Sequence, residues 1–98
     1  MFRHVVLFSW TQDATQAQQE AMADELRKLP GAIDSVRAYH VGPDAGQNPG
    51  KNHDFAVVAD FDDAEGYRTY RDHPAHRAVV EQYVNPIVAQ RAGVQYEL

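Results

Sequence analysis

The chain of 98 residues contains no cysteine, which excludes disulfides, thiolate metal sites and a cysteine nucleophile. No apolar run approaches the ~20 residues that cross a bilayer. The N-terminal stretch also lacks the long apolar segment and small-residue cleavage site of a secretion signal. The 9 basic residues are scattered and outnumbered by 14 acidic ones, for a net charge of −5. We therefore expect a cytoplasmic protein that binds neither nucleic acid nor membranes.

What is present is typical of one small soluble domain. Apolar residues make up 44% of the chain and charged residues 23%, which are ordinary values for a globular protein. We expect a single domain over residues 1–98, without repeats or linkers. A chain of this size buries only roughly 60 to 65% of the surface that it exposes when unfolded. A further patch buried against a second copy would therefore stabilise it.

Two segments are predicted to be strands with both faces covered. Phe2 to Trp10 alternates His4, Val6 and Phe8 on one face with Val5 and Leu7 on the other, and both sets are largely apolar. The segment from residue 55 to residue 61 is almost wholly apolar, as expected of a central strand. Shorter strands are predicted over residues 36–41, ended by Gly42-Pro43, and over residues 93–98.

Three helical segments lie between these strands. The first begins after Thr15, which with Gln18 forms a capping box, and ends before Pro30-Gly31. Its apolar positions at helical spacing are Ala17, Ala21, Met22, Leu26 and Leu29. Asp62-Asp63 is expected to cap a short helix that carries Tyr67 and Tyr70.

Asp72-His73-Pro74 breaks that short helix, and His73 is expected to cap the next one. The new helix runs from Ala75 until Asn85-Pro86 and turns inward the residues His76, Val79, Val80, Tyr83 and Val84. The order is β-α-β-β-α-β with a split second helix, which indicates an α+β, ferredoxin-like fold with a four-stranded antiparallel sheet.

Several motifs make the chain recognisable: Arg3-His4-Val5-Val6-Leu7-Phe8, Leu29-Pro30-Gly31, Val41-Gly42, Asp60-Phe61 and, above all, Tyr70-Arg71-Asp72-His73-Pro74-Ala75-His76. Together they resemble the stress-responsive dimeric α/β-barrel (Dabb) family over essentially the whole chain. The resemblance implies a homodimer in which two sheets face each other as a dimeric α/β barrel. It fits the independent observation of strands that are apolar on both faces.

One branch of that family, the polyketide-cyclase (olivetolic acid cyclase-like) branch, carries a tyrosine and a histidine at the positions of Tyr70 and His76, and a first-strand histidine at that of His4. The resemblance implies a cofactor-independent intramolecular aldol reaction with His76 as base and Tyr70 as hydrogen-bond donor. The first helix departs from the branch, because Ala21, Met22 and Leu26 stand where the cyclase has bulkier aromatics. The connection between Pro30 and Gly42 is also longer.

The residues themselves allow this chemistry. A neutral imidazole in an apolar cleft is free at pH 7 to take a proton from a carbon between two carbonyls. A phenol is able to donate to the developing enolate oxygen. The alternative is structural, with His76 holding the helix junction and Tyr70 bonded to a backbone carbonyl. His4 is either a pocket residue or a buried core histidine, whereas His40 and His53 are expected to be solvated.

The expected ligand is a small apolar compound that contains a carbonyl group. Besides His76 and Tyr70, the predicted pocket walls are His4, Val6, Phe8, Met22, Leu26, Tyr67, Val80 and Tyr83. No cofactor is expected and no metal, because Pro74 turns His73 and His76 apart and no third ligand is evident. Two other functions stay open: a non-catalytic stress protein whose pocket is filled by its own side chains, and a cofactor-free monooxygenase of aromatic polyketides.

Overall fold

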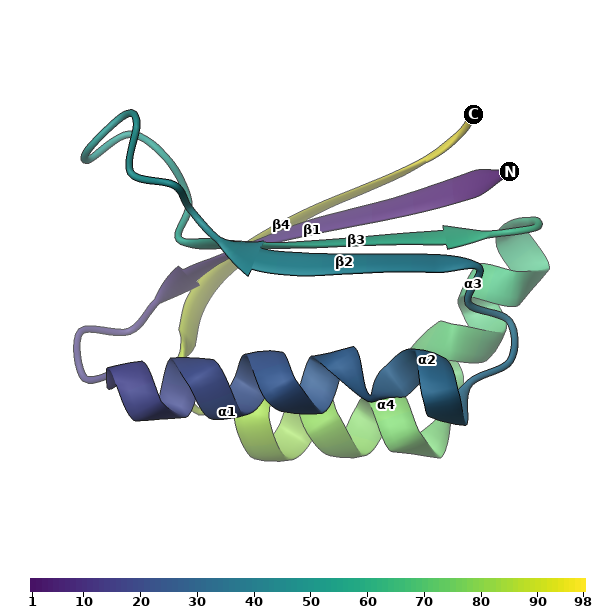
Figure 1. Cartoon of the computed structure of the whole chain (residues 1–98), viewed down its shortest axis with the longest axis horizontal. Coiled ribbons are helices and arrows are strands. Elements are labelled where there is room, and N and C mark those ends of the chain that lie inside the picture. The colour runs from purple at the N-terminus through teal and green to yellow at the C-terminus, as the bar shows by residue number, and fades with distance from the viewer.

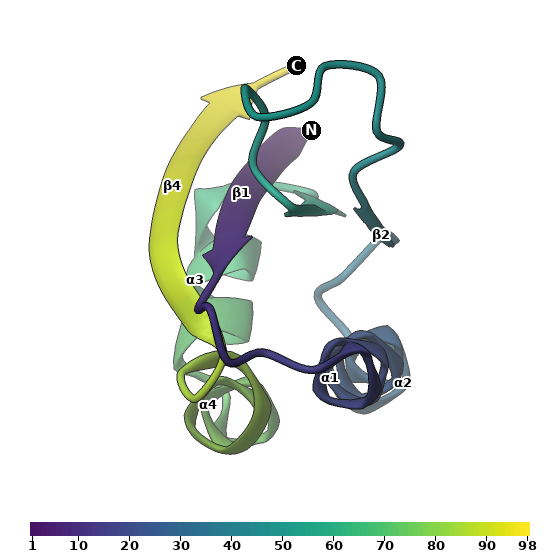
Figure 2. The same cartoon turned by 90° about the vertical axis from the view of Figure 1, so that its left-hand side faces the viewer.

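The computed structural model describes residues 1–98 and has one four-stranded sheet with helices on one face only (Figures 1 and 2). The elements are β1 (Phe2–Trp10), α1 (Gln16–Arg27), α2 (Leu29–Ala32), β2 (Ala38–Pro43), β3 (Phe55–Phe61), α3 (Ala64–Asp72), α4 (Pro74–Val79), the π-helical turn η1 (Val80–Val84) and β4 (Val88–Glu97). The ferredoxin-like α+β fold with a split second helix is confirmed. None of these helices is long and apolar enough to span a bilayer.

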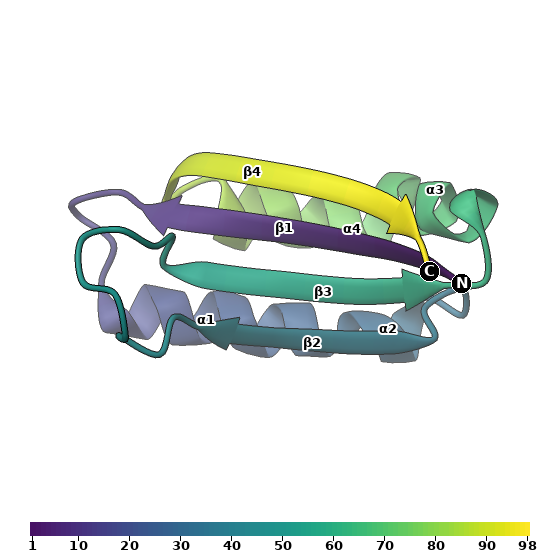
Figure 3. The ribbon, with the colours of Figure 1, turned by 90° about the horizontal axis from the view of Figure 1, so that it is seen from above.

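The strands are antiparallel in the order β2-β3-β1-β4, so β3 is central, as expected, and so is β1 (Figure 3). Val5 lies opposite Val58 of β3 and Val94 of β4. The two termini meet at one end of the sheet, where the amide of Leu98 donates to the carbonyl of Met1 over 2.8 Å. This register puts every second residue of β1 under the helices.

Two strands differ from their predicted bounds. β2 begins at Ala38 and continues through Gly42 to Pro43, which lies opposite Phe55. Proline is tolerated there because β2 is an edge strand and the missing N–H faces away from the ladder. β4 begins at Val88 and not at residue 93, because β1 offers it a partner along its whole length.

Helix α1 starts as predicted, with both hydrogen bonds of the capping box formed between Thr15 and Gln18. Met22 and Leu26 are buried, but Ala23 joins them while Ala17 and Ala21 are exposed. The interpretation of these two alanines was wrong, because a methyl group fits either face of a helix and carries little information about its orientation.

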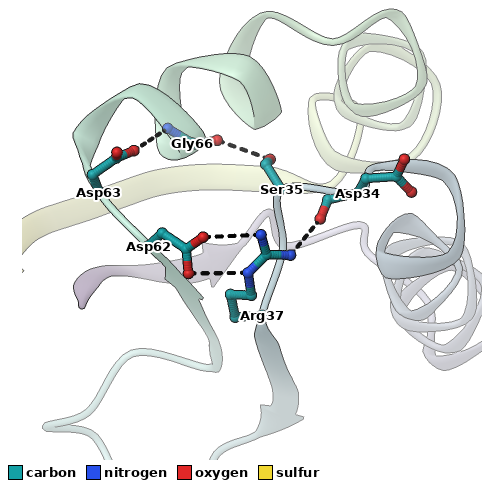
Figure 4. A network of polar contacts seen from close by, with 6 residues as sticks. All are labelled: Asp34, Ser35, Arg37, Asp62, Asp63 and Gly66. Atoms are coloured by element: carbon teal, nitrogen blue, oxygen red, sulfur yellow. Dashed lines mark hydrogen bonds and ion pairs between the residues drawn. The ribbon is translucent and has the colours of Figure 1, made fainter.

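The start of α3 is fixed by a polar network (Figure 4). Asp63 accepts the amide of Gly66 at 2.9 Å and caps the helix, and the hydroxyl of Ser35 donates to the carbonyl of Gly66 at 2.9 Å. Arg37 forms a two-pronged ion pair with Asp62 at 3.0 and 2.9 Å, which ties β2 to the turn before α3. Asp63 therefore has the capping role expected of this pair, and Asp62 has an anchoring role that was not predicted.

The break between α3 and α4 is closed by His73, whose Nδ1 accepts the amide of Ala75 at 3.0 Å, as predicted. Further along, the amide of Asn85 donates to the carbonyl of Val80 at 2.8 Å, a five-residue step that marks the π-helical turn. Such widened turns are frequent at functional sites. Here the turn places Val80 and Val84 over the sheet.

Candidate functional site

A cavity of about 230 Å³ lies between the sheet and the helices. It is lined by His4, Val6, Phe8, Leu26, Val57, Tyr67, Tyr70, Arg71, His76, Val80, Val84 and Arg91. Among these only Arg71 and Arg91 are exposed residues, so they mark the mouth, and the rest of the wall is apolar apart from histidines and tyrosines. Two other hollows, of about 470 and 690 Å³, lie under the 44–54 loop and beside α1. About half of the residues around each are exposed, and neither contains His4, Tyr70 or His76.

His76 enters the cavity from α4 with a defined proton position. Its Nδ1 lies 3.0 Å from the backbone carbonyl of Arg71. A carbonyl only accepts, so Nδ1 carries the hydrogen and Nε2 holds the lone pair. Burial lowers the pKa of His76 below its ordinary value, against the opposing effect of that carbonyl. At neutral pH the ring is therefore a neutral imidazole with a free basic nitrogen.

His4 reaches the same cavity from β1, but its ring hydrogen is on the other nitrogen than in His76. The side-chain amide of Gln95, on the neighbouring strand, donates to His4 Nδ1 at 2.9 Å, so the hydrogen of the neutral ring is on Nε2. Burial and, secondarily, the nearby His76 lower the pKa of His4 to about 4. No buried side-chain nitrogen or oxygen lacks a partner. Since Nε2 of His4 makes no hydrogen bond, it opens onto the cavity as a donor.

The ring of Tyr70 packs against that of His76, with centroids 4.3 Å apart and the ring planes tilted by 39°, but its hydroxyl is bonded elsewhere. That hydroxyl lies 2.8 Å from the hydroxyl of Tyr39 on β2. Burial raises the pKa of both phenols, that of Tyr39 to about 12. Tyr67 packs beside His4 with centroids 4.9 Å apart. Tyr70 thus has its proton at neutral pH and a side-chain partner rather than a backbone carbonyl.

Eight of the ten predicted pocket residues line this cavity, and Met22 and Tyr83 do not. Met22 is fully buried in the core, and Tyr83 lies in a separate hollow with Glu25, Lys28 and Leu29. Helical spacing identifies the inward face of a helix but does not separate tight core from cavity wall. Four wall residues were not predicted: Val57 and Val84, whose sequence pattern is that of core residues, and the two arginines of the mouth. Tyr39 was not predicted either, because its pairing with Tyr70 across 31 positions depends on how separate elements are brought together.

The other histidines lie outside the cavity. His40 is exposed on β2. His53 is half-buried, contrary to expectation, because its Nδ1 bonds the hydroxyl of Ser9 at 2.8 Å. No three histidine, aspartate or glutamate side chains gather in a way that would hold a metal ion.

Comparison with known proteins agrees with this architecture. The model of the stress responsive A/B barrel domain matches residues 2–98. An uncharacterised protein of Streptomyces coelicolor is 32% identical over 82 residues, which cover 82% of this chain and 84% of that protein. A dimeric ferredoxin-like protein of unknown function from Thermobifida fusca is 44% identical, with a TM-score of 0.90 over 99% of this chain and 90% of that one.

The fold alone is shared with the hydroxynitrile lyase of Passiflora edulis, at 14% identity and a TM-score of 0.86 over 99% of this chain and 92% of that one. Fold likeness at this level assigns no activity. The family model, in contrast, covers nearly the entire sequence. The chain belongs to the stress-responsive α/β-barrel (Dabb) family.

Proposed function

We propose that the protein binds a small carbonyl compound in the cavity and removes a proton from the carbon next to the carbonyl, as a cofactor-independent, cyclase-like enzyme of the aldol type. The observation that carries this proposal is the bond between His76 Nδ1 and the Arg71 carbonyl. It leaves Nε2 of a neutral, buried imidazole as a base. Family membership supports the fold, whereas the polyketide-cyclase activity belongs to the proposal alone.

His4 supplies the complementary group. When His76 Nε2 takes the proton from carbon, the electron pair of the C–H bond moves to the carbonyl oxygen and forms an enolate. The N–H of His4 and the hydroxyl of Tyr70 are suited to donate to that oxygen. The enolate carbon then attacks a second carbonyl of the same molecule, and the new alkoxide recovers the proton from His76. The sum is an isomerisation that consumes no co-reactant.

The cavity volume limits the substrate. A cavity of 150 Å³ binds benzene, so about 230 Å³ holds about nine non-hydrogen atoms. A long polyketide does not fit inside, although its reactive end does. Heptane-2,6-dione has the size of the cavity and closes to a six-membered ring by an aldol step, which makes it a suitable probe.

We further infer that the chain forms a homodimer through the helix-free face of its sheet. The Thermobifida fusca relative is described as dimeric. In a single copy this face exposes Val94 and Tyr96 and leaves Val5 and Leu7 only half-buried. Soluble monomers seldom leave so continuous an apolar patch open.

The test of the activity is deuterium exchange at the α-carbons of heptane-2,6-dione, followed by NMR, together with formation of the cyclic hydroxyketone that the aldol step produces. The parent protein should accelerate both reactions. His76→Ala should abolish the acceleration while the melting temperature changes little, and Arg77→Ala, which truncates an exposed side chain of α4 outside the cavity, should leave it intact. A parent protein that accelerates neither reaction, with this probe or with linear poly-β-ketoacyl compounds, would favour the non-catalytic stress protein.

A further inference from the structure

The mouth of the cavity contains two arginines with different electrostatic environments. Arg71 forms a two-pronged ion pair with Asp72, at 2.8 and 3.0 Å, so its charge is compensated. Arg91 forms no ion pair. In a protein of net charge −5 it is the one uncompensated cation on the cavity wall.

The position of Arg91 is fixed although its charge is unpaired. The residue lies on β4 opposite Phe8 of β1, and both side chains point to the helix-covered face because cross-strand neighbours share a face. The guanidinium carbon lies 5.9 Å from the centroid of the Phe8 ring. Its Nη2 donates to the side-chain oxygen of Asn85 at 2.7 Å. Asn85 follows η1, so the residue after the π-helical turn orients this arginine.

These contacts leave most of the hydrogen-bonding capacity of Arg91 unused. A guanidinium has five N–H donors, and one of them is occupied here. The free donors suit a planar anion, because the fork of arginine matches a carboxylate with two parallel hydrogen bonds. An anion at this point would stand at the solvent end of the cavity, and the rest of its molecule would extend inward between His4 and His76.

We propose that Arg91 is a specificity-determining residue that recognises a carboxylate on the ligand, so that the preferred ligands are small keto acids rather than neutral ketones. This inference rests on the proposed function for the site but not on catalysis. Recognition of the carboxylate requires only that the molecule binds in the cavity.

The experiment compares 4-oxopentanoate with its methyl ester, two molecules that differ in charge and fit the cavity. Affinities are measured by calorimetry or by NMR titration at low salt. The parent should bind the acid at least about tenfold more tightly than the ester, as expected for a charge-assisted hydrogen-bonded pair. Arg91→Gln should remove this preference and leave the affinity for the ester unchanged. Arg91→Lys should keep part of the preference, because it keeps the charge and loses the fork.

Arg77→Gln is the matched control, since it removes one positive charge from an exposed arginine that neither lines the cavity nor forms an ion pair. It should leave the preference for the acid intact. Equal affinities of the parent for acid and ester, or a preference that survives Arg91→Gln, would overturn the proposal. A carboxylate preference without deuterium exchange at the carbons next to the ketone of bound 4-oxopentanoate would sustain the role of Arg91 and refute the enzyme. Deuterium exchange without a preference for the carboxylate would support the enzyme and refute the role of Arg91.

Discussion

The two faces of β1 lie in opposite environments although they belong to the same nine residues. Towards the helices, His4 and Phe8 are buried, and no solvent-inaccessible side-chain nitrogen or oxygen lacks a hydrogen-bond partner. On the other face Val5 and Leu7 are half-buried, and next to them on β4 Val94 is 55% and Tyr96 44% exposed. The helices of the same chain bury the first face, whereas nothing in a single chain covers the second, helix-free face, which is called the open face below. The proposed chemistry therefore belongs to the first face and the proposed association with a second copy to the other.

The one strong polar feature of the open face fits this division. Arg3 and Asp60 form a two-pronged ion pair there, at 2.7 and 2.8 Å. The guanidinium of Arg3 holds the pKa of Asp60 below its ordinary value. Both partners are satisfied within the chain, so a second copy that covers this face would leave neither charge unpaired, which is the costly case for buried ions.

The largest effect is expected from Leu7→Glu, at the centre of the open face. A two-fold interface would bring two copies of the new carboxylate into an apolar layer, a cost of several kcal/mol by rough estimate. Sedimentation should therefore change from a dimer to the 11.0 kDa monomer. Ala21→Glu, which adds the same charge on an exposed position of α1, should leave the dimer unchanged. If the parent protein sediments as a monomer at micromolar concentration, the open face does not bind a second copy and the inferred homodimer is wrong.

Much of this division could be predicted from the sequence. The alternation in β1, the capping box at Thr15 and the proline at residue 74 are local signals, and the elements they predict are present. The motif from Tyr70 to His76 also located one wall of the cavity. What could not be predicted is non-local. The pairing of Tyr39 with Tyr70, the approach of Arg91 to the mouth and the use of Met22 as core depend on how elements pack, and no residue pattern within one element encodes that.

A middle-sized effect is expected from His4, whose pKa of about 4 lies below the ordinary 6.5. Between these values the unfolded chain binds a proton that the folded chain does not. The contribution of His4 is therefore fully present above pH 6.5 and is lost as the pH falls towards 4. Allowing for solvent that reaches the ring through the cavity, the loss amounts to about 2 kcal/mol. His76, whose pKa is also lowered, adds in the same direction.

Denaturant unfolding at pH 7 and at pH 4.5 measures this contribution. His4→Phe should lose less stability than the parent between the two pH values, because the titrating group is gone. Arg77→Gln, on an exposed position of α4 outside the cavity, should behave as the parent does. If His4→Phe and the parent lose the same free energy of unfolding, then His4 is solvated in the folded state and the helix-covered face is not as closed as the structure indicates.

The smallest effect concerns the hydrogen bond between Tyr39 and Tyr70, which separates a structural from a catalytic role for Tyr70. Tyr39→Phe leaves a buried phenol without its partner and should cost about 1 to 2 kcal/mol of unfolding free energy. Tyr70→Phe should cost a similar amount, and the double variant should cost less than the sum, because it leaves no hydroxyl unpaired. Tyr67→Phe removes a hydroxyl that makes no side-chain hydrogen bond and serves as the neutral control for stability.

The rate of deuterium exchange in the substrate tests a catalytic role of Tyr70, which unfolding free energies do not measure. Tyr70 is free to donate to a ligand in the cavity only when Tyr39 supplies the proton of their shared bond, since a phenol has one hydrogen. If Tyr70 assists the enolate, Tyr70→Phe should lower deuterium exchange by roughly 10²-fold. Tyr39→Phe should lower it less, because Tyr70 keeps its proton but loses its orientation. Should both variants lose stability and keep the parent's exchange rate, Tyr70 is a packing residue, and His4 is the sole donor facing His76 across the cavity.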